Sequence, residues 1–211
     1  MTETLFVPRA GFDMEEPWTT PAACSPVRLR RSADAAVPRL ATSVAVWYDA
    51  ECLSVLFSAT DDAIRAIHHR HDDPLYEDDV VEVFLAPDTL TRYYELEANP
   101  NGAVFDATVD SPDGSRATMH VDRGWDCAGL VVAIRKVFES TGWMTIDTVL
   151  RIPFSSLGRV SPAEGEQWRI NFFRVDRHAE EGDEFSAWQA TGKEPPDFHV
   201  PAAFGVLRFG A

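Results

Sequence analysis

The sequence predicts an all-β protein, a single antiparallel β-sandwich of the immunoglobulin-like or jelly-roll type with roughly nine to eleven strands. Two observations support this prediction. Short apolar or alternating segments recur along the chain, separated by Gly, Pro, Asn and Asp, whereas helical periodicity is scarce. The chain has 211 residues, of which 45% are hydrophobic and 25% charged, so it can form one full core.

The strands are expected to follow an extended N-terminal segment, residues 1–26, which contains four prolines and wraps the sandwich. We treat residues 1–211 as one domain. Alternation and β-branched content predict strands at 27–31, 43–48, 52–59, 80–85, 92–98, 103–109, 130–136, 143–151, 168–176 and 205–209. The segment 152–157 breaks this pattern and predicts one helical turn. Long loops at 60–79, 110–129 and 177–200 carry many His, Asp and Trp residues, and binding sites on β scaffolds usually lie in such loops.

The hairpin at 93–106 is the most informative segment. Side chains alternate between the faces of a strand, so Tyr93, Glu95 and Glu97 share one face and the apolar residues between them share the other. Asn101-Gly102 is typical of a tight hairpin turn. We therefore expect a half-buried sheet whose solvent-exposed face carries tyrosines and carboxylates, a surface that suits a polar, ring-shaped ligand such as a sugar.

Composition excludes several classes of partner. The net charge is −15, with 34 acidic and 19 basic residues, and this field repels nucleic acid and anionic membranes. Cys24, Cys52 and Cys127 have neither metal-like nor disulfide-like spacing. The chain lacks an apolar run long enough to span a membrane and begins without a recognisable secretion signal. We expect a cytoplasmic protein, or a secreted one if a signal was removed; the oligomeric state stays open.

Four segments in the same order resemble the family 9 carbohydrate-binding modules. They are a hairpin ending in Asp, AVWYDAECLSVLFSATDD (45–62); DDVVEVFLAP (78–87); YYELEANPNGAVFD (93–106); and a closing strand, FHVPAAFGVLRF (198–209). Together the resemblance spans roughly residues 18 to 210, nearly the whole chain. It implies a β-sandwich that binds a saccharide non-catalytically.

The resemblance also implies individual residues. A sugar ring in such modules is clasped between two aromatic side chains, and the matching positions here are Tyr76 and Trp188. Glu82 matches a hydrogen-bonding carboxylate. The family's arginine in the hairpin strand is replaced here by Glu97, which changes the expected sugar preference. The alternative for both aromatic residues is burial in the sandwich.

The residues themselves leave other interpretations open. Glu82 shares a strand face with apolar neighbours, and a buried carboxylate needs donors, so Arg174 is expected to serve either as its structural partner or as a ligand-binding residue. Glu95 and Glu97, about 6.8 Å apart along a strand, could serve a glycoside hydrolase, although solvated strand glutamates are commoner. A domain converted to protein interaction is a third class.

Metal binding is a further alternative. The cluster His68-His69-Arg70-His71-Asp72-Asp73 offers transition-metal ligands for a metal-dependent enzyme, or it forms a solvated loop. We expect no cofactor, with a structural calcium ion as the alternative because acidic pairs recur in the loops, at 61–62, 72–73, 78–79 and 110–113.

Overall fold

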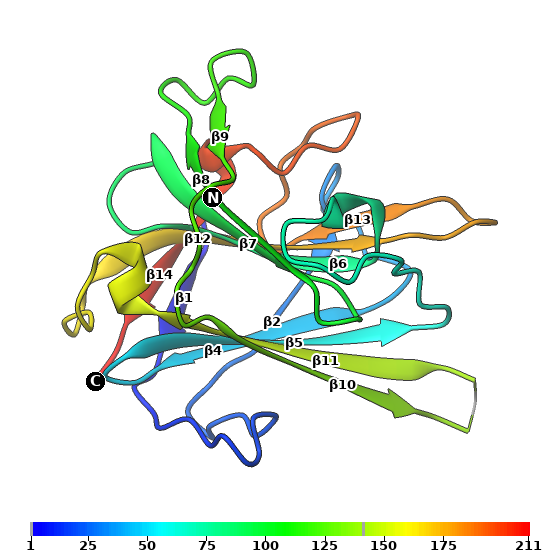
Figure 1. Cartoon of the computed structure of the whole chain (residues 1–211), viewed down its shortest axis with the longest axis horizontal. Coiled ribbons are helices and arrows are strands. Elements are labelled where there is room, and N and C mark those ends of the chain that lie inside the picture. Colours follow the sequence, from blue (N-terminus) through cyan, green and yellow to red (C-terminus); the bar gives the residue numbers. More distant parts are fainter. Residues whose placement is uncertain (1, 141) are drawn as a thin grey trace.

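Two β-sheets face each other in the computed structural model, which describes residues 2–140 and 142–211 (Figure 1). The smaller sheet has the order β10-β11-β5-β4-β2, with bounds Val131–Phe138, Met144–Pro153, Cys52–Asp61, Thr42–Tyr48 and Val27–Arg28. The larger sheet has the order β1-β14-β12-β6-β7-β8-β9, with bounds Thr4–Val7, Gly205–Phe209, Gln167–Asp176, Val80–Ala86, Arg92–Ala98, Val104–Asp110 and His120–Asp122. It is extended beside β12 by β13 (Glu184–Ala187) and β3 (Arg30–Arg31).

The predicted β-sandwich is confirmed, and most of the expected strands agree with the observed ones within one or two residues. The expected helical turn is the 3-10 helix η2, Phe154–Leu157. Two further 3-10 helices are η1, Leu75–Glu77, and η3, Pro201–Ala203. The strand number was underestimated, because β1, β9 and β13 lie in segments that were expected to be loops or extended chain. Each of these strands has only three or four residues, too few for a readable alternation.

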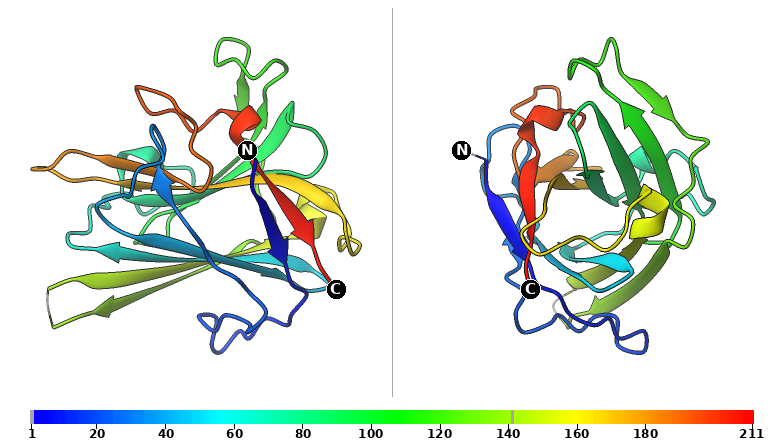
Figure 2. Two further views of the ribbon diagram at one scale, coloured as in Figure 1. Left: turned by 180° about the vertical axis from the view of Figure 1, so that it is seen from behind. Right: turned by 90° about the vertical axis from the view of Figure 1, so that its left-hand side faces the viewer.

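The N-terminal segment contributes an edge strand. β1 pairs in parallel with the closing strand β14, so the sandwich is not purely antiparallel (Figure 2). The chain then crosses to the outside of the smaller sheet, where Phe12 stacks on Trp47 with ring centroids 6.0 Å apart. Arg135 of β10 lies 4.9 Å from the Trp18 ring.

The larger sheet buries apolar side chains on both faces. Its inner face packs against the smaller sheet through residues such as Val83, Leu96 and Phe172. Its outer face forms a second core, in which Phe84, Tyr93 and other side chains are covered by η1, β9, β13 and the 196–204 segment. The outer face was expected to be exposed to solvent, and that expectation is wrong because these loops fold over it.

Among the described residues, none of the helices has the length and apolar character needed to cross a membrane.

Candidate functional site

A cavity of about 420 Å³ opens on the outer face of the larger sheet. We call it the outer-face pocket. Its floor carries Glu82, Glu95 and Glu97. Aromatic side chains and arginines from separate segments of the chain form its sides, together with His199; they are Tyr76, Phe105, Phe185, Phe198, Arg116, Arg123 and Arg177. A pocket with aromatic walls and a few polar groups on its floor is the usual form of a small-molecule site.

The three floor glutamates come from two neighbouring strands. In the β6–β7 ladder Glu82 lies directly opposite Glu97. Glu95 is two residues before Glu97 in β7 and shares its face. Their exposed fractions are 4%, 4% and 5%, respectively. The predicted alternation of Tyr93, Glu95 and Glu97 is thus correct, but these carboxyl groups are buried rather than solvated.

Burial changes the acidity of this floor. Desolvation raises the pKa of Glu95 to about 7, because the charged form loses its water. Desolvation likewise raises the pKa of Glu82 and Glu97 well above the usual range, and repulsion from the neighbouring carboxylates adds to both shifts. The carboxyl groups of Glu95 and Glu97 are close enough to share a proton, which lowers the pKa of Glu95 and raises that of Glu97. The floor carboxyl groups therefore lose their protons at a higher pH than a solvated glutamate does.

His199 closes one side of the floor. Its Nδ1 lies 2.8 Å from the Tyr93 hydroxyl, and its Nε2 lies 3.7 Å from Oε1 of Glu95. Burial lowers the pKa of His199 to about 4, so the imidazole is neutral at physiological pH. A neutral imidazole beside a carboxyl group can donate or accept a hydrogen bond, which suits recognition of a hydroxyl group.

The walls combine aromatic rings with arginines. Leu75 anchors η1 in the outer-face core, and the next residue, Tyr76, is 53% exposed at the pocket. The Arg177 guanidinium donates to the Tyr76 carbonyl and lies 5.5 Å from the Phe185 ring centroid. Arg123 lies 5.6 Å from the Phe105 ring. Flat rings and planar guanidinium groups thus surround an acidic floor.

Trp188 is not at this pocket. It is 5% exposed and packs in the core between the sheets, with its ring centroid 5.7 Å from that of Phe172. Its ring also covers Gly205, where an added Cβ would lie 2.2 Å from a ring carbon. Tyr76 and Trp188 therefore lie on opposite faces of the larger sheet, and this pair does not form the expected clamp.

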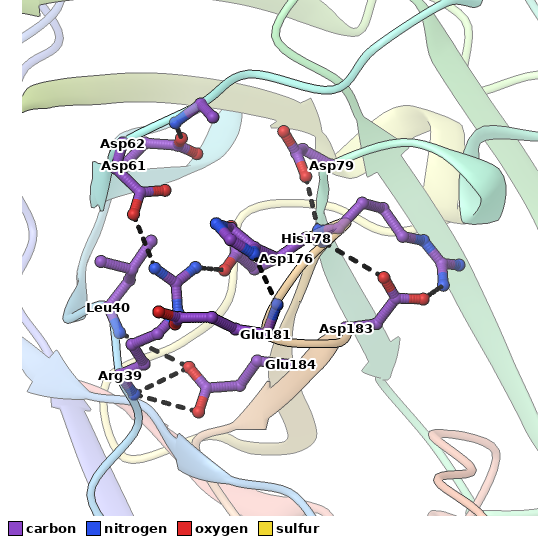
Figure 3. Close-up of polar contacts among 12 residues, drawn as sticks. Arg39, Leu40, Asp61, Asp62, Asp79, Asp176, His178, Glu181, Asp183 and Glu184 are labelled. Carbon is purple, nitrogen blue, oxygen red and sulfur yellow. Dashed lines mark hydrogen bonds and ion pairs between the residues drawn. The ribbon is translucent and has the colours of Figure 1, made fainter.

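Arg174 is also on the inner face. Its guanidinium donates to Asp61 at 2.9 Å, to Asp176 at 3.1 Å and to the carbonyl oxygen of Thr60 at 2.8 Å. Arg39 binds the other oxygen of Asp176, at the edge of a polar network that extends to β13 (Figure 3). The expected pair of Glu82 with Arg174 is therefore absent: their side chains point to opposite faces of the sheet.

The histidine cluster and the acidic pairs are mostly engaged by protein groups. His68 contacts Asp78 at 3.1 Å, and backbone N–H groups donate to both oxygens of Asp79. His71 lies near Asp72 and Asp126 in a group that is exposed to solvent. The loop carboxylates proposed for calcium thus serve largely as hydrogen-bond acceptors within the fold.

The comparisons with known proteins agree with this architecture. The sequence model of carbohydrate-binding family 9 matches residues 28–209. A protein of Arthroderma benhamiae named "Extracellular protein" is 25% identical over 178 residues, covering 80% of this chain and 78% of that protein.

Solved structures share the fold at lower identity. A candidate carbohydrate-binding protein from Bacteroides uniformis superposes with a TM-score of 0.73 at 19% identity, covering 99% of this chain and 100% of that one. A family 9 module from Caldicellulosiruptor kristjanssonii in complex with cellotriose gives a TM-score of 0.60 at 14% identity, with 99% and 94% covered. Its glucose complex gives 0.62 at 14%, with 99% and 97% covered. Because the family model matches residues 28–209, most of the chain, this protein belongs to carbohydrate-binding family 9.

Proposed function

We propose that the protein binds a saccharide non-catalytically in the outer-face pocket. The observation that carries this proposal is the combination of an exposed ring, Tyr76, with buried carboxyl groups in one cavity. Sugar rings present apolar C–H faces that stack on aromatic rings, while their hydroxyl groups need fixed hydrogen-bonding partners. Membership of carbohydrate-binding family 9 and the sugar complexes of the Caldicellulosiruptor module support the same function.

The residue roles differ from those expected from the sequence. We assign Tyr76 as the main stacking wall and Phe185 as the second, in place of Trp188. Glu82 and Glu97 are the hydrogen-bonding partners on the floor, with His199 beside them. Arg177, which holds both Tyr76 and Phe185, takes the place of Arg174. The size of the pocket, about 420 Å³, suits one or two sugar rings rather than a polymer surface.

Calorimetric titration with glucose, cellobiose, cellotriose, xylose and galactose tests the proposal. We expect a heat of binding with at least one sugar. Tyr76→Ala should weaken that affinity by about tenfold, since a lost ring contact is worth about 0.5–1.5 kcal/mol. Phe6→Ala is the matched control: this ring is 63% exposed on β1, outside the pocket, and its removal should leave affinity unchanged. Absence of binding to every sugar, or an equal loss in both variants, would contradict the proposal.

Hydrolysis is the second candidate, favoured by the raised pKa of Glu95, about 7, which suits a general acid at neutral pH. A reducing-sugar assay with the same ligands separates the two functions. A binding protein releases no product, and Glu95→Gln changes only its affinity. An enzyme turns substrate over, and Glu95→Gln abolishes turnover while binding persists.

A further inference from the structure

The floor of the pocket brings three carboxyl groups into one small volume. One carboxylate oxygen from each of Glu82, Glu95 and Glu97 lies within 4.8 Å of the others. All three side chains are at least nine-tenths buried. Like charges this close in a poorly solvated site repel strongly, so the group needs either protons or a cation.

A second observation points to a missing ligand. Oε2 of Glu97 is buried and lacks a hydrogen-bond partner among the described residues. Glu97 itself lines the cavity. A buried polar atom without a partner costs free energy, and such atoms usually mark the place of an ion, a water molecule or a ligand group.

Among the described residues, no arginine or lysine forms an ion pair with the three carboxylates, although Nε of Arg177 is buried without a hydrogen-bond partner. Arg116 pairs with Asp197 at 3.3 Å, Arg123 covers Phe105, and Arg177 binds Asp183 and the Tyr76 carbonyl. His199 faces Glu95 but is neutral at physiological pH. These groups lower the negative potential of the pocket without placing a positive charge among the three carboxylates.

We propose that Glu82, Glu95 and Glu97 together bind one calcium ion at the floor of the pocket, and that vicinal hydroxyl groups of a saccharide complete its coordination. Calcium takes about six to eight oxygen ligands at about 2.3–2.6 Å, so its ligand oxygens lie up to about 5 Å apart. Magnesium loses its bound water reluctantly and prefers one or two carboxylates, so it suits a site of three carboxyl groups with positions open to a sugar less well than calcium does.

Three glutamates supply between three and six of the oxygens that calcium requires. The remaining positions face the cavity, where water occupies them until a ligand arrives. Adjacent hydroxyl groups of a sugar offer two oxygens at a suitable spacing. The calcium site rests on the carboxylate geometry and on the unpartnered oxygen of Glu97, whereas its contact with a sugar rests on the proposed function.

Titration of calcium chloride alone into chelator-treated protein at pH 7.5 tests the site. We expect one equivalent to bind in the wild type. In Glu97→Gln, which keeps the shape but removes a charge, we expect affinity at least tenfold weaker. Asp126→Asn is the matched control, because Asp126 belongs to the exposed group with His71 and Asp72, and affinity should change less than twofold. Circular dichroism confirms that each variant is folded.

Two outcomes overturn the calcium site. One is no binding heat in the wild type with no change in melting temperature on adding chelator, which means that the three carboxyl groups hold protons instead. The other is loss of binding in Asp126→Asn but not in Glu97→Gln, which places the ion in the exposed group.

Coordination of the sugar by calcium is tested separately, by measuring saccharide affinity with and without chelator. Saccharide affinity that falls at least tenfold in chelator supports direct coordination. Calcium binding with a saccharide affinity indifferent to chelator overturns the coordination step and leaves the calcium site intact. Calcium binding with no saccharide binding at all contradicts the proposed function and the coordination step, but not the calcium site.

Discussion

The two faces of the larger sheet each bury a charged cluster, and the two clusters are built in opposite ways. On the inner face, Arg174 lies between Asp61 and Asp176, and Arg39 pairs with Asp176 and Asp62. On the outer face, three glutamates converge, and no arginine or lysine of the described residues pairs with them. Adjacent residues of β12 face the two clusters. Arg174 points inward, whereas Phe173, which lies opposite Glu82 in the ladder, points outward.

This difference indicates that the inner cluster stabilises the fold and the outer cluster belongs to the proposed binding site. In the inner cluster each guanidinium has its partners: carboxylates, a hydroxyl group and a backbone oxygen hold Arg174, and carboxylates hold Arg39. It lies where the two sheets meet. The outer cluster is uncompensated and opens to a cavity. A buried charge that has its partners stabilises a fold, whereas a buried group of like charges beside a cavity is poised to receive a ligand.

Replacing Arg174 by Met should produce the largest effect. It leaves Asp61 and Asp176 buried without their shared cation, and breaking such a pair costs about 3–5 kcal/mol of unfolding free energy. Arg116→Met, at the rim of the outer-face pocket, should cost less than about 1 kcal/mol, because Arg116 and its contact with Asp197 are partly exposed. Urea denaturation measures both. Equal losses would mean that the inner cluster is no more structural than the rim.

The acidity of the outer floor gives the second prediction. Glu95 has a folded pKa of about 7 against 4.5 for the unfolded chain, so its protonated form stabilises the fold at low pH, and this contribution is lost as pH rises toward 7. Glu95→Gln mimics the protonated state. Relative to the wild type it should therefore gain up to about 3 kcal/mol between pH 5 and pH 8.

Chelator must be present, since calcium would replace the protons. The lowered pKa of His199 has the opposite effect, because the fold loses stability as pH falls from about 6.5 toward 4. Wild type and variant are therefore compared at each pH, so that this shared contribution cancels. Glu82, Glu97, Arg116 and Arg123 face the same group and set the size of the effect. The exposed Glu164→Gln variant should show no pH-dependent difference, and a flat result for Glu95→Gln would refute the buried, protonated floor.

Much of the fold could be predicted from the sequence because the strands are long and their ends are marked by turn residues. The alternation in β7 placed Tyr93, Glu95 and Glu97 on one face correctly. Their burial could not be predicted, because the covering segments come from η1, β9, β13 and the 196–204 loop, distant in sequence. A strand pattern indicates which residues share a face but not what lies above that face.

The site was only half predictable for the same reason. Tyr76, Glu82 and Glu97 meet in the pocket. Arg116, Arg123 and His199 join them from loops, and Phe185 from the short strand β13, and none of these segments carries a local signal. In β12 the run INFFRVD is apolar on both faces, so alternation could not show that Arg174 points inward. Trp188 follows a four-residue strand whose register with β12 is set by tertiary pairing.

A change at Trp188 gives the finest test of the contrast between the two faces, because it should lower stability through the inner face and leave saccharide binding at the outer face unchanged. Trp188→Phe leaves a small cavity beside Phe172 and Gly205, which should cost about 1–3 kcal/mol of unfolding free energy. Saccharide affinity, measured by calorimetry well below the melting temperature, should stay within twofold of wild type, since the ring does not line the outer-face pocket. Tyr76→Ala is the reciprocal variant: saccharide affinity should fall about tenfold, as above, while stability should stay within about 0.5 kcal/mol of wild type because this ring is 53% exposed. A large affinity loss in Trp188→Phe without loss of stability would return this ring to the binding site and remove the distinction between the two faces.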